Sequence, residues 1–210
     1  MTDLAVERER DFERFLTFVD AIVAIAITLL VLPLVDVAGA FHGDSVADLL
    51  RTHSDQIWAF FLSFVVIADL WLAQHRLLHN VVAADRVLLR LMLLWALTIV
   101  VLPFLTALVA GSTGQEGVTK ALYVGAMAAS ALVLALVCVL VRRRPELRDS
   151  EEKPDHVHSF AMVAAFLAAL AVMLLLPGLS YWPLLLLLVP DRAIGAWRRR
   201  SSPGEQQPRR

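Results

Sequence analysis

Two aspartates lie within long apolar stretches of the sequence, where an ionisable side chain is costly unless it is paired or hydrated. Asp20 follows the run Phe15 to Val19, and Asp69 lies between Ala68 and Leu70. His75, six residues after Asp69, can bind and release a proton near neutral pH. Such residues either lock neighbouring helices together or form a relay for protons or cations.

Counting along the two predicted helices places these polar groups at similar depths. Asp20 lies six residues beyond Arg14, about 9 Å along a helix. On the next helix, which runs the opposite way, Trp71 and Asp69 lie five and seven residues before Arg76. We therefore expect a polar cluster, with two interpretations open: a lock between the two helices, or a proton or cation relay. Its members are Arg14, Asp20, Asp69, Trp71 and His75.

An aliphatic stripe follows Asp20 at helical spacing. Its members step by three, four and three residues: Ile22, Ile25, Leu29 and Leu32. Such a stripe usually faces lipid or a neighbouring helix, and lines a pore less often. Thr28 lies on or beside it, and its default role is a hydrogen bond to the Ala24 carbonyl. Facing a central pathway, a ring of such hydroxyls could replace part of the hydration shell of an ion.

The other reactive residue types give little support for catalysis or metal binding. His75 and His79 have the i, i+4 spacing of some metal sites, but no carboxylate or cysteine shares their face. Cys138 is the single cysteine, which excludes an internal disulfide. No nucleotide-binding motif or Ser/His/Asp constellation is present. We expect no enzyme activity, no cofactor, no metal and no nucleic-acid partner.

The elements that position these residues are membrane-spanning helices. Hydrophobic residues make up 59% of the 210 residues and charged residues only 19%, with a mean hydropathy of +0.68. A soluble domain of this size could not bury that much apolar surface. Uncharged runs of about 18 to 20 residues are long enough to cross a bilayer, and only helices satisfy their own backbone there. Six spans are predicted, at about 15–35, 56–75, 90–110, 119–141, 158–176 and 179–197.

Charge placement predicts that both termini are cytoplasmic. With the N-terminus inside, all Lys and Arg residues except Arg51 and Lys120 lie on the cytoplasmic side. A five-span alternative with a re-entrant last segment would place the arginine-rich tail outside. Cleavage of the first span as a signal peptide at Ala38-Gly39-Ala40 is disfavoured by the acidic leader and by Asp20.

The chain divides into three parts on this reading. Residues 1–14 form a cytoplasmic N-terminal segment, residues 15–197 a six-helix transmembrane domain, and residues 198–210 a disordered basic cytoplasmic tail. The fold class is all-α, a polytopic membrane protein in the lipid bilayer. We expect a bacterial plasma membrane, because the single set of six spans and the bias toward Ala, Leu, Val and Arg both suggest a bacterial origin.

Several segments together resemble one channel family. Arg14 to Asp20, followed by Ala24 to Leu32, is similar to the first helix of the transmembrane protein 175 potassium channels. The signature of that helix is an Arg, three residues, then Phe-Ser-Asp. The stretch from Ser63-Phe64 to Trp71 and His75-Arg76 agrees with the second helix, and Leu102-Pro103-Phe104-Leu105-Thr106 with the end of the third. The recognisable motifs span residues 14 to 110.

The resemblance implies a passive potassium-preferring cation channel that conducts potassium and other monovalent cations. It also implies a homotetramer in which helix one of each subunit lines a central pore. By spacing from Asp20, the hydrophobic constriction or gate falls on Ile25, with Leu29 and Leu32 continuing it outward. Thr28 is the pore hydroxyl that contributes to selectivity. A support network for helix one is expected from Arg14, Phe18, Asp20, Trp71 and His75.

Three residues differ from the family pattern. Val19 replaces the signature serine, Asp69 stands where an apolar or small residue is usual, and Gln74 replaces the first of two histidines. Two other functions stay open: a proton-coupled secondary transporter that uses Asp69 and His75 as a relay, and a non-conducting membrane scaffold.

Overall fold

The computed structural model describes residues 3–39, 45–111 and 116–147, and these are largely helical. Long apolar runs form helices because a helix satisfies its own backbone hydrogen bonds. The elements are α1 (Asp3–Leu29), α2 (Leu32–Gly39), α3 (Val46–Thr52), α4 (Ser54–Leu78), α5 (Arg86–Gly111), α6 (Glu116–Arg143) and the short 3₁₀ helix η1 (Pro145–Leu147).

Four helical segments are long and apolar enough to cross a membrane. They are Glu9–Gly39, Ser54–Leu78, Arg86–Gly111 and Gly117–Arg143. These confirm the all-α class and the first four predicted spans. The spans predicted at 158–176 and 179–197, and the predicted tail at 198–210, lie outside the described residues. Helix α1 also runs through most of the predicted cytoplasmic segment 1–14, since it begins at Asp3.

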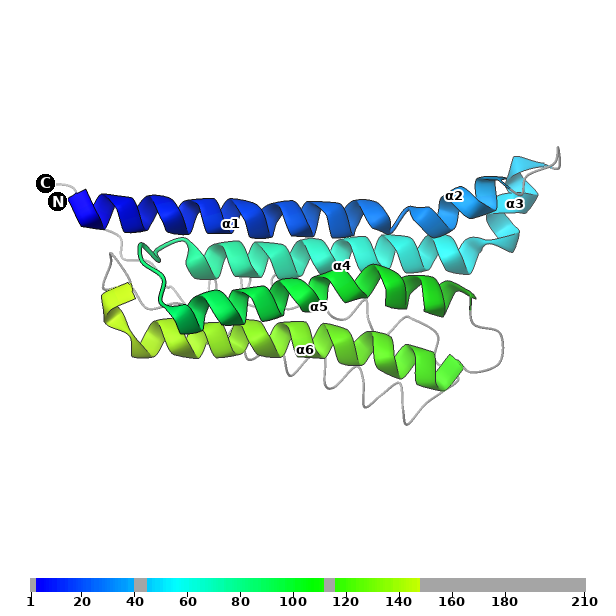
Figure 1. The fold of residues 1–210 in the computed structure, drawn as a ribbon. Helices are drawn as coiled ribbons and strands as arrows, with labels where there is room; N and C mark the ends of the chain where they lie inside the picture. The colour runs from blue at the N-terminus through cyan, green and yellow to red at the C-terminus, as the bar shows by residue number, and fades with distance from the viewer. Residues whose placement is uncertain (1–2, 40–44, 112–115, 148–210) are drawn as a thin grey trace, which may run out of the picture.

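The long helices lie side by side and alternate in direction (Figure 1). Helix α5 contacts α1, α4 and α6, so it occupies the middle of the described bundle. One end of the bundle, on the left of Figure 1, gathers the start of α1, the connection from α4 to α5, and the end of α6 with η1. We call this the N-terminal end; the charge pattern of the sequence predicts that it faces the cytoplasm.

The core combines large apolar side chains with one buried cluster of hydroxyl groups. Trp95, Ile67 and Met92 are fully buried. Ser63 on α4 lies 2.9 Å from the Thr106 hydroxyl on α5, and 2.6 Å from the Tyr123 hydroxyl on α6. Hydrogen bonds between membrane helices each contribute about 1 kcal/mol. The cluster therefore fixes the register of three helices at one level.

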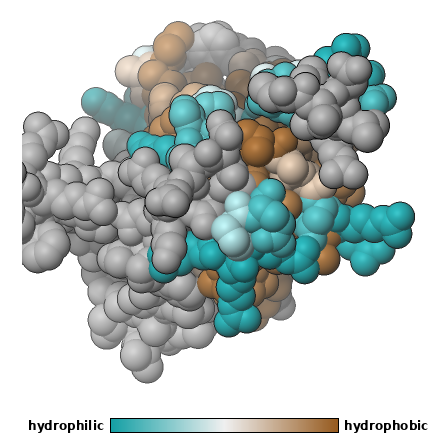
Figure 2. All heavy atoms as spheres, turned by 90° about the vertical axis from the view of Figure 1, so that its left-hand side faces the viewer, coloured by the Kyte–Doolittle hydropathy of each residue, from teal (hydrophilic) through white to brown (hydrophobic). Residues whose placement is uncertain are grey.

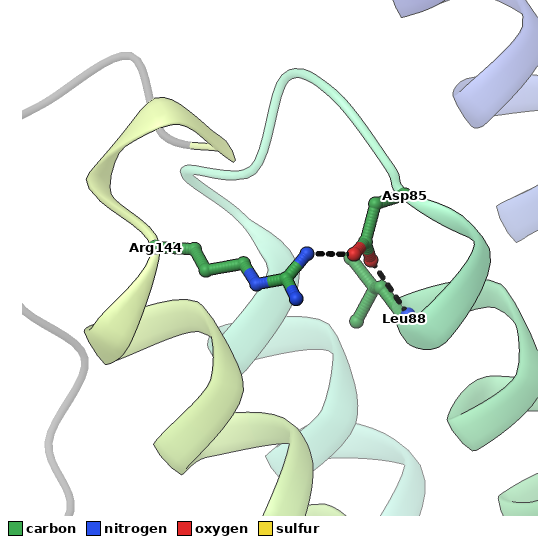
Figure 3. Close-up of polar contacts among 3 residues, drawn as sticks. All are labelled: Asp85, Leu88 and Arg144. Atoms are coloured by element: carbon green, nitrogen blue, oxygen red, sulfur yellow. Dashed lines mark hydrogen bonds and ion pairs between the residues drawn. The ribbon is translucent and has the colours of Figure 1, made fainter.

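A second polar contact holds the N-terminal end together (Figure 3). Asp85 caps α5, because its Oδ1 accepts a hydrogen bond of 2.8 Å from the Leu88 N–H. Its other carboxylate oxygen pairs with Arg144 at the end of α6. The Val82 N–H also donates to the Leu147 carbonyl at 3.0 Å. Since the ion pair is partly exposed, its main effect is to position the α4–α5 connection against η1.

Candidate functional site

Helix α1 has one face packed against the bundle and one face that the described chain leaves uncovered. Val19, Val23, Ala26 and Leu30 are buried and recur at steps of four, three and four residues, as expected for one side of a helix. The opposite side exposes Phe18, Thr28 and two members of the predicted stripe. The exposed fraction is 60% for Ile25 and 41% for Leu29.

The predicted stripe is not continuous, because the helix is interrupted before Pro33. α1 ends at Leu29 and α2 begins at Leu32. Proline has no N–H, and its ring crowds the carbonyl four residues earlier, here that of Leu29. In the junction the N–H groups of Leu30 and Val31 bond to carbonyls only three residues back, at 3.3 Å. Leu32 therefore belongs to α2, where it is exposed, and Ile22 is half-buried against the core.

Thr28 makes a different hydrogen bond from the one predicted. Its hydroxyl donates to the Ile25 carbonyl at 2.7 Å, so the expected bond to the Ala24 carbonyl is wrong. Both bonds are typical of threonine in a helix. The hydroxyl proton is used inside the helix, and the exposed oxygen keeps its lone pairs for another partner.

Asp20 contacts Trp71, as the depth count predicts. The indole Nε1 of Trp71 on α4 donates to the Asp20 Oδ1 on α1 at 2.8 Å. The Trp71 ring lies 5.6 Å from the His75 ring, centroid to centroid, and is tilted by 32° against it. Asp20 and Trp71 are both half-buried, so this hydrogen bond to a carboxylate is partly shielded from water. The contact links α1 to α4 at this level.

Two members of the expected support network lie elsewhere. Arg14 is exposed, and the hydrogen bond between Asp20 and Trp71 does not involve it. Phe18 is 55% exposed and does not belong to the core cluster. Both lie on α1, where the exposed face continues toward the N-terminal end. Any role of Phe18 in fixing α1 therefore needs a partner outside the described chain.

Asp69 and His75 are not on one face of α4. Six residues on a helix correspond to a rotation of about 240°, which leaves the two side chains about 120° apart. Asp69 is half-buried and has an interaction of its own, while His75 is exposed beside Trp71. Among residues 3–39, 45–111 and 116–147, no group of three His, Cys, Asp or Glu side chains could hold a metal ion.

A groove at the other end of the bundle was not predicted. It has a volume of about 620 Å³ and lies between the α1–α2 junction and α5. Leu29, Leu32 and Pro33 line one side, and Pro103 and Phe104 the other. The only sequence signal for it is the pair of prolines, because each removes a backbone hydrogen bond and changes how the helix packs. The groove extends the exposed face of α1.

Comparison with known proteins shows which channel family this chain is similar to. Residues 14–103 match the family model described as endosomal/lysosomal potassium channel TMEM175. The predicted TMEM175 resemblance is confirmed. Among curated proteins, no sequence matches the chain significantly. The matched segment includes every residue of the expected TMEM175 gate and support network, from Arg14 to His75.

The fold also matches a solved TMEM175 structure. It is similar to the crystal structure of a lysosomal potassium-selective channel TMEM175 homolog from Chamaesiphon minutus, with a TM-score of 0.62 and 23% sequence identity. The match covers 92% of this chain and 100% of that chain. At this identity the likeness shows the fold.

The structure explains how one departure from the TMEM175 signature is accommodated. Val19, which replaces the signature serine, is fully buried, with an exposed fraction of 0%. A valine at such a position leaves no hydroxyl that would need a partner. Asp20, the next residue, still forms its hydrogen bond to Trp71. The loss of the serine hydroxyl is thus compatible with both the packing of α1 and its anchor on α4.

Proposed function

We propose that this chain forms a potassium-preferring cation channel. Four copies surround a central pore, and α1 of each copy lines it. The observation behind this proposal is the exposed face of α1 at Ile25 and Leu29, on a helix that Asp20 anchors from the side. The TMEM175 match over residues 14–103 supports the same conclusion.

The burial of the four spans supports α1 as the helix that packs against other copies of the chain. Within an apolar stretch of 18 residues in each span, the fraction of residues that are buried is 22% for α1 with α2, 33% for α4, 50% for α5 and 61% for α6. The span that the described chain covers least has the most surface left for an oligomer. A single helix per subunit cannot enclose a pore, but a closed ring of subunits can.

The side chains on the exposed face suit passive conduction. A ring of Ile25 side chains would form a hydrophobic neck that sheds water readily, which is how apolar constrictions gate ion flow. One turn further on, the Thr28 hydroxyls would offer oxygen lone pairs, because their protons are bonded to the Ile25 carbonyls. Oxygen acceptors can replace part of the hydration shell of a potassium ion.

A proton-coupled transporter is the second function to test. It would need Asp69 and His75 to exchange protons, but their positions about 120° apart on α4 do not favour direct transfer. Carriers of this type commonly use broken helices at the substrate site, but α4, which carries both residues, is a single helix from Ser54 to Leu78. The break between α1 and α2 lies beside Gln56, at the other end of α4 from His75. The channel therefore explains the described geometry better.

Ion flux through purified protein in liposomes separates the two functions. We expect a potassium gradient to drive a charge-separating efflux, reported by a voltage-sensitive dye, and a sodium gradient to drive a smaller one. The internal pH should change only after a protonophore is added, because a channel has no obligatory proton step. Asp69→Asn should leave the flux unchanged if the protein elutes like the parent. A pH change strictly tied to potassium movement without protonophore would instead establish the carrier.

A further inference from the structure

A second cavity opens at the N-terminal end of the bundle, away from the exposed face at Ile25. It lies between residues 9–20 of α1 and residues 74–82 at and after the end of α4, and its volume is about 460 Å³. That size is within the range of small-molecule sites. Figure 2 looks at this end of the molecule, where hydrophilic side chains surround smaller hydrophobic areas.

The walls of this cavity combine an apolar surface with negative charge. Phe12, Leu78 and Val81 are buried and supply the apolar part. Glu9 and Glu13, one helical turn apart on α1, supply carboxylates, and Asp20 lies further in. Among the described residues that line the cavity, none is Lys or Arg. The other ionisable residues of the lining are His75 and His79. With three carboxylates and no Lys or Arg, the field inside the cavity favours a cation.

Gln74 lines this cavity and carries a buried acceptor, which a ligand reaches once the side-chain amide turns toward the cavity. Its side chain is only 2% exposed and lines the cavity. Its Oε1 has no hydrogen-bond partner in the part of the chain that the structure describes. A buried acceptor without a partner destabilises a protein by about 1–3 kcal/mol. A ligand that donates a hydrogen bond to Oε1 would remove this cost, whereas an acceptor ligand would not.

We propose that this cavity binds a primary ammonium group attached to a short aliphatic chain. The ammonium donates to Gln74 Oε1 and is attracted by Glu13 and Glu9, while the aliphatic chain covers Phe12 and Leu78. A bare metal ion fits less well, because no described group of three His, Cys, Asp or Glu side chains is close enough to hold one. The same ammonium chemistry occurs in free alkylamines and in ethanolamine lipid headgroups. The proposal does not depend on ion conduction.

Binding of hexylamine to the purified full-length protein in detergent tests the proposal. At pH 8 we expect saturable binding by calorimetry and an increase in Tm. Hexanol and hexanoate, which have similar aliphatic chains without the ammonium, should bind at least about tenfold more weakly, the factor that corresponds to about 1.4 kcal/mol. Equal affinity for hexanol would overturn the proposal, since the cavity would then recognise only apolar surface.

Two variants connect this binding to the named residues. Gln74→Leu keeps the side-chain volume and removes the unpaired acceptor, so it should fold at least as well as the parent but bind hexylamine about tenfold more weakly. Glu13→Gln should also weaken binding. The matched control is Gln56→Leu, the same change at the far end of α4, where Gln56 contacts His53 instead. Unchanged affinity in folded Gln74→Leu protein would contradict the assignment.

Nanodiscs distinguish the two sources of the ammonium group. If the headgroup of a lipid occupies the cavity, hexylamine should bind more weakly in phosphatidylethanolamine than in phosphatidylcholine. If the ligand is a free amine, the two affinities should agree. Either result supports ammonium recognition, and loss of hexylamine binding in both lipids would overturn it. Because the readout is binding, a negative flux assay would leave this test unaffected.

Discussion

Replacing Ile25 with asparagine is expected to increase potassium flux by about tenfold or more, equivalent to lowering the barrier by about 1.4 kcal/mol. The asparagine side chain is smaller than that of isoleucine, and its polar amide keeps water in the neck, so the cost of removing water from the ion falls. Ile25→Ala should act in the same direction by widening the neck. Both variants should reduce the preference for potassium over sodium, because an ion that keeps more of its water is distinguished less by its bare size.

The neighbouring positions provide graded controls for this result. Leu29→Ala, one turn further along α1, should raise flux less than Ile25→Ala does if the narrowest level is at Ile25. Leu32→Ala, beyond the break between α1 and α2, should have the smallest effect. Leu97 on α5 is 58% exposed, almost the same as Ile25, and Leu97→Ala should leave flux unchanged. Unchanged flux and ion preference in both Ile25 variants, at verified tetramer yield, would place the pathway elsewhere.

The second large effect is expected from removing the anchor of α1. Asp20→Ala leaves the Trp71 indole N–H without the acceptor that now lies 2.8 Å away. An unpaired donor in a partly buried site costs about 1–3 kcal/mol, and the rotation of α1 is no longer fixed. We expect the proposed tetramer, measured by mass in detergent, to dissociate and the potassium flux to fall with it.

Two further variants separate the anchor from a general effect of charge. Asp20→Asn keeps an oxygen acceptor for Trp71, so it should retain much of the assembly that Asp20→Ala loses. Asp48→Ala removes an exposed aspartate on the short helix α3 and should behave like the parent. If the Asp20→Ala protein assembled and conducted like the parent, the anchoring role of Asp20 would be wrong.

The parts of the fold that follow from hydropathy could be predicted from the sequence. Uncharged runs predicted the ends of the first four spans to within six residues, because span length is set by the thickness of the bilayer. The contact between Asp20 and Trp71 could also be predicted, since counting residues from Arg14 and Arg76 fixes depth along two antiparallel helices.

Features that depend on how side chains pack were missed or misplaced. Counting places Arg14 near the polar cluster, yet its side chain lies outside the contact, because depth does not specify direction around the helix. The spacing of the aliphatic residues predicted a continuous stripe up to Leu32, although Pro33 follows directly. The structure instead divides this segment into α1 and α2. No sequence pattern predicted the cavity at Gln74, because its walls come from segments more than 50 residues apart.

The central claim, that the exposed face of α1 lines the potassium pathway, is tested most directly with Ag⁺, a thiol-reactive cation close in size to K⁺. The native Cys138 is buried, so the parent protein should react little with Ag⁺. We predict that Ag⁺ rapidly and irreversibly blocks potassium flux through Ile25→Cys protein and leaves the parent and Leu97→Cys unaffected. Block of the Leu97→Cys protein, with full flux retained by the Ile25→Cys protein, would contradict the claim.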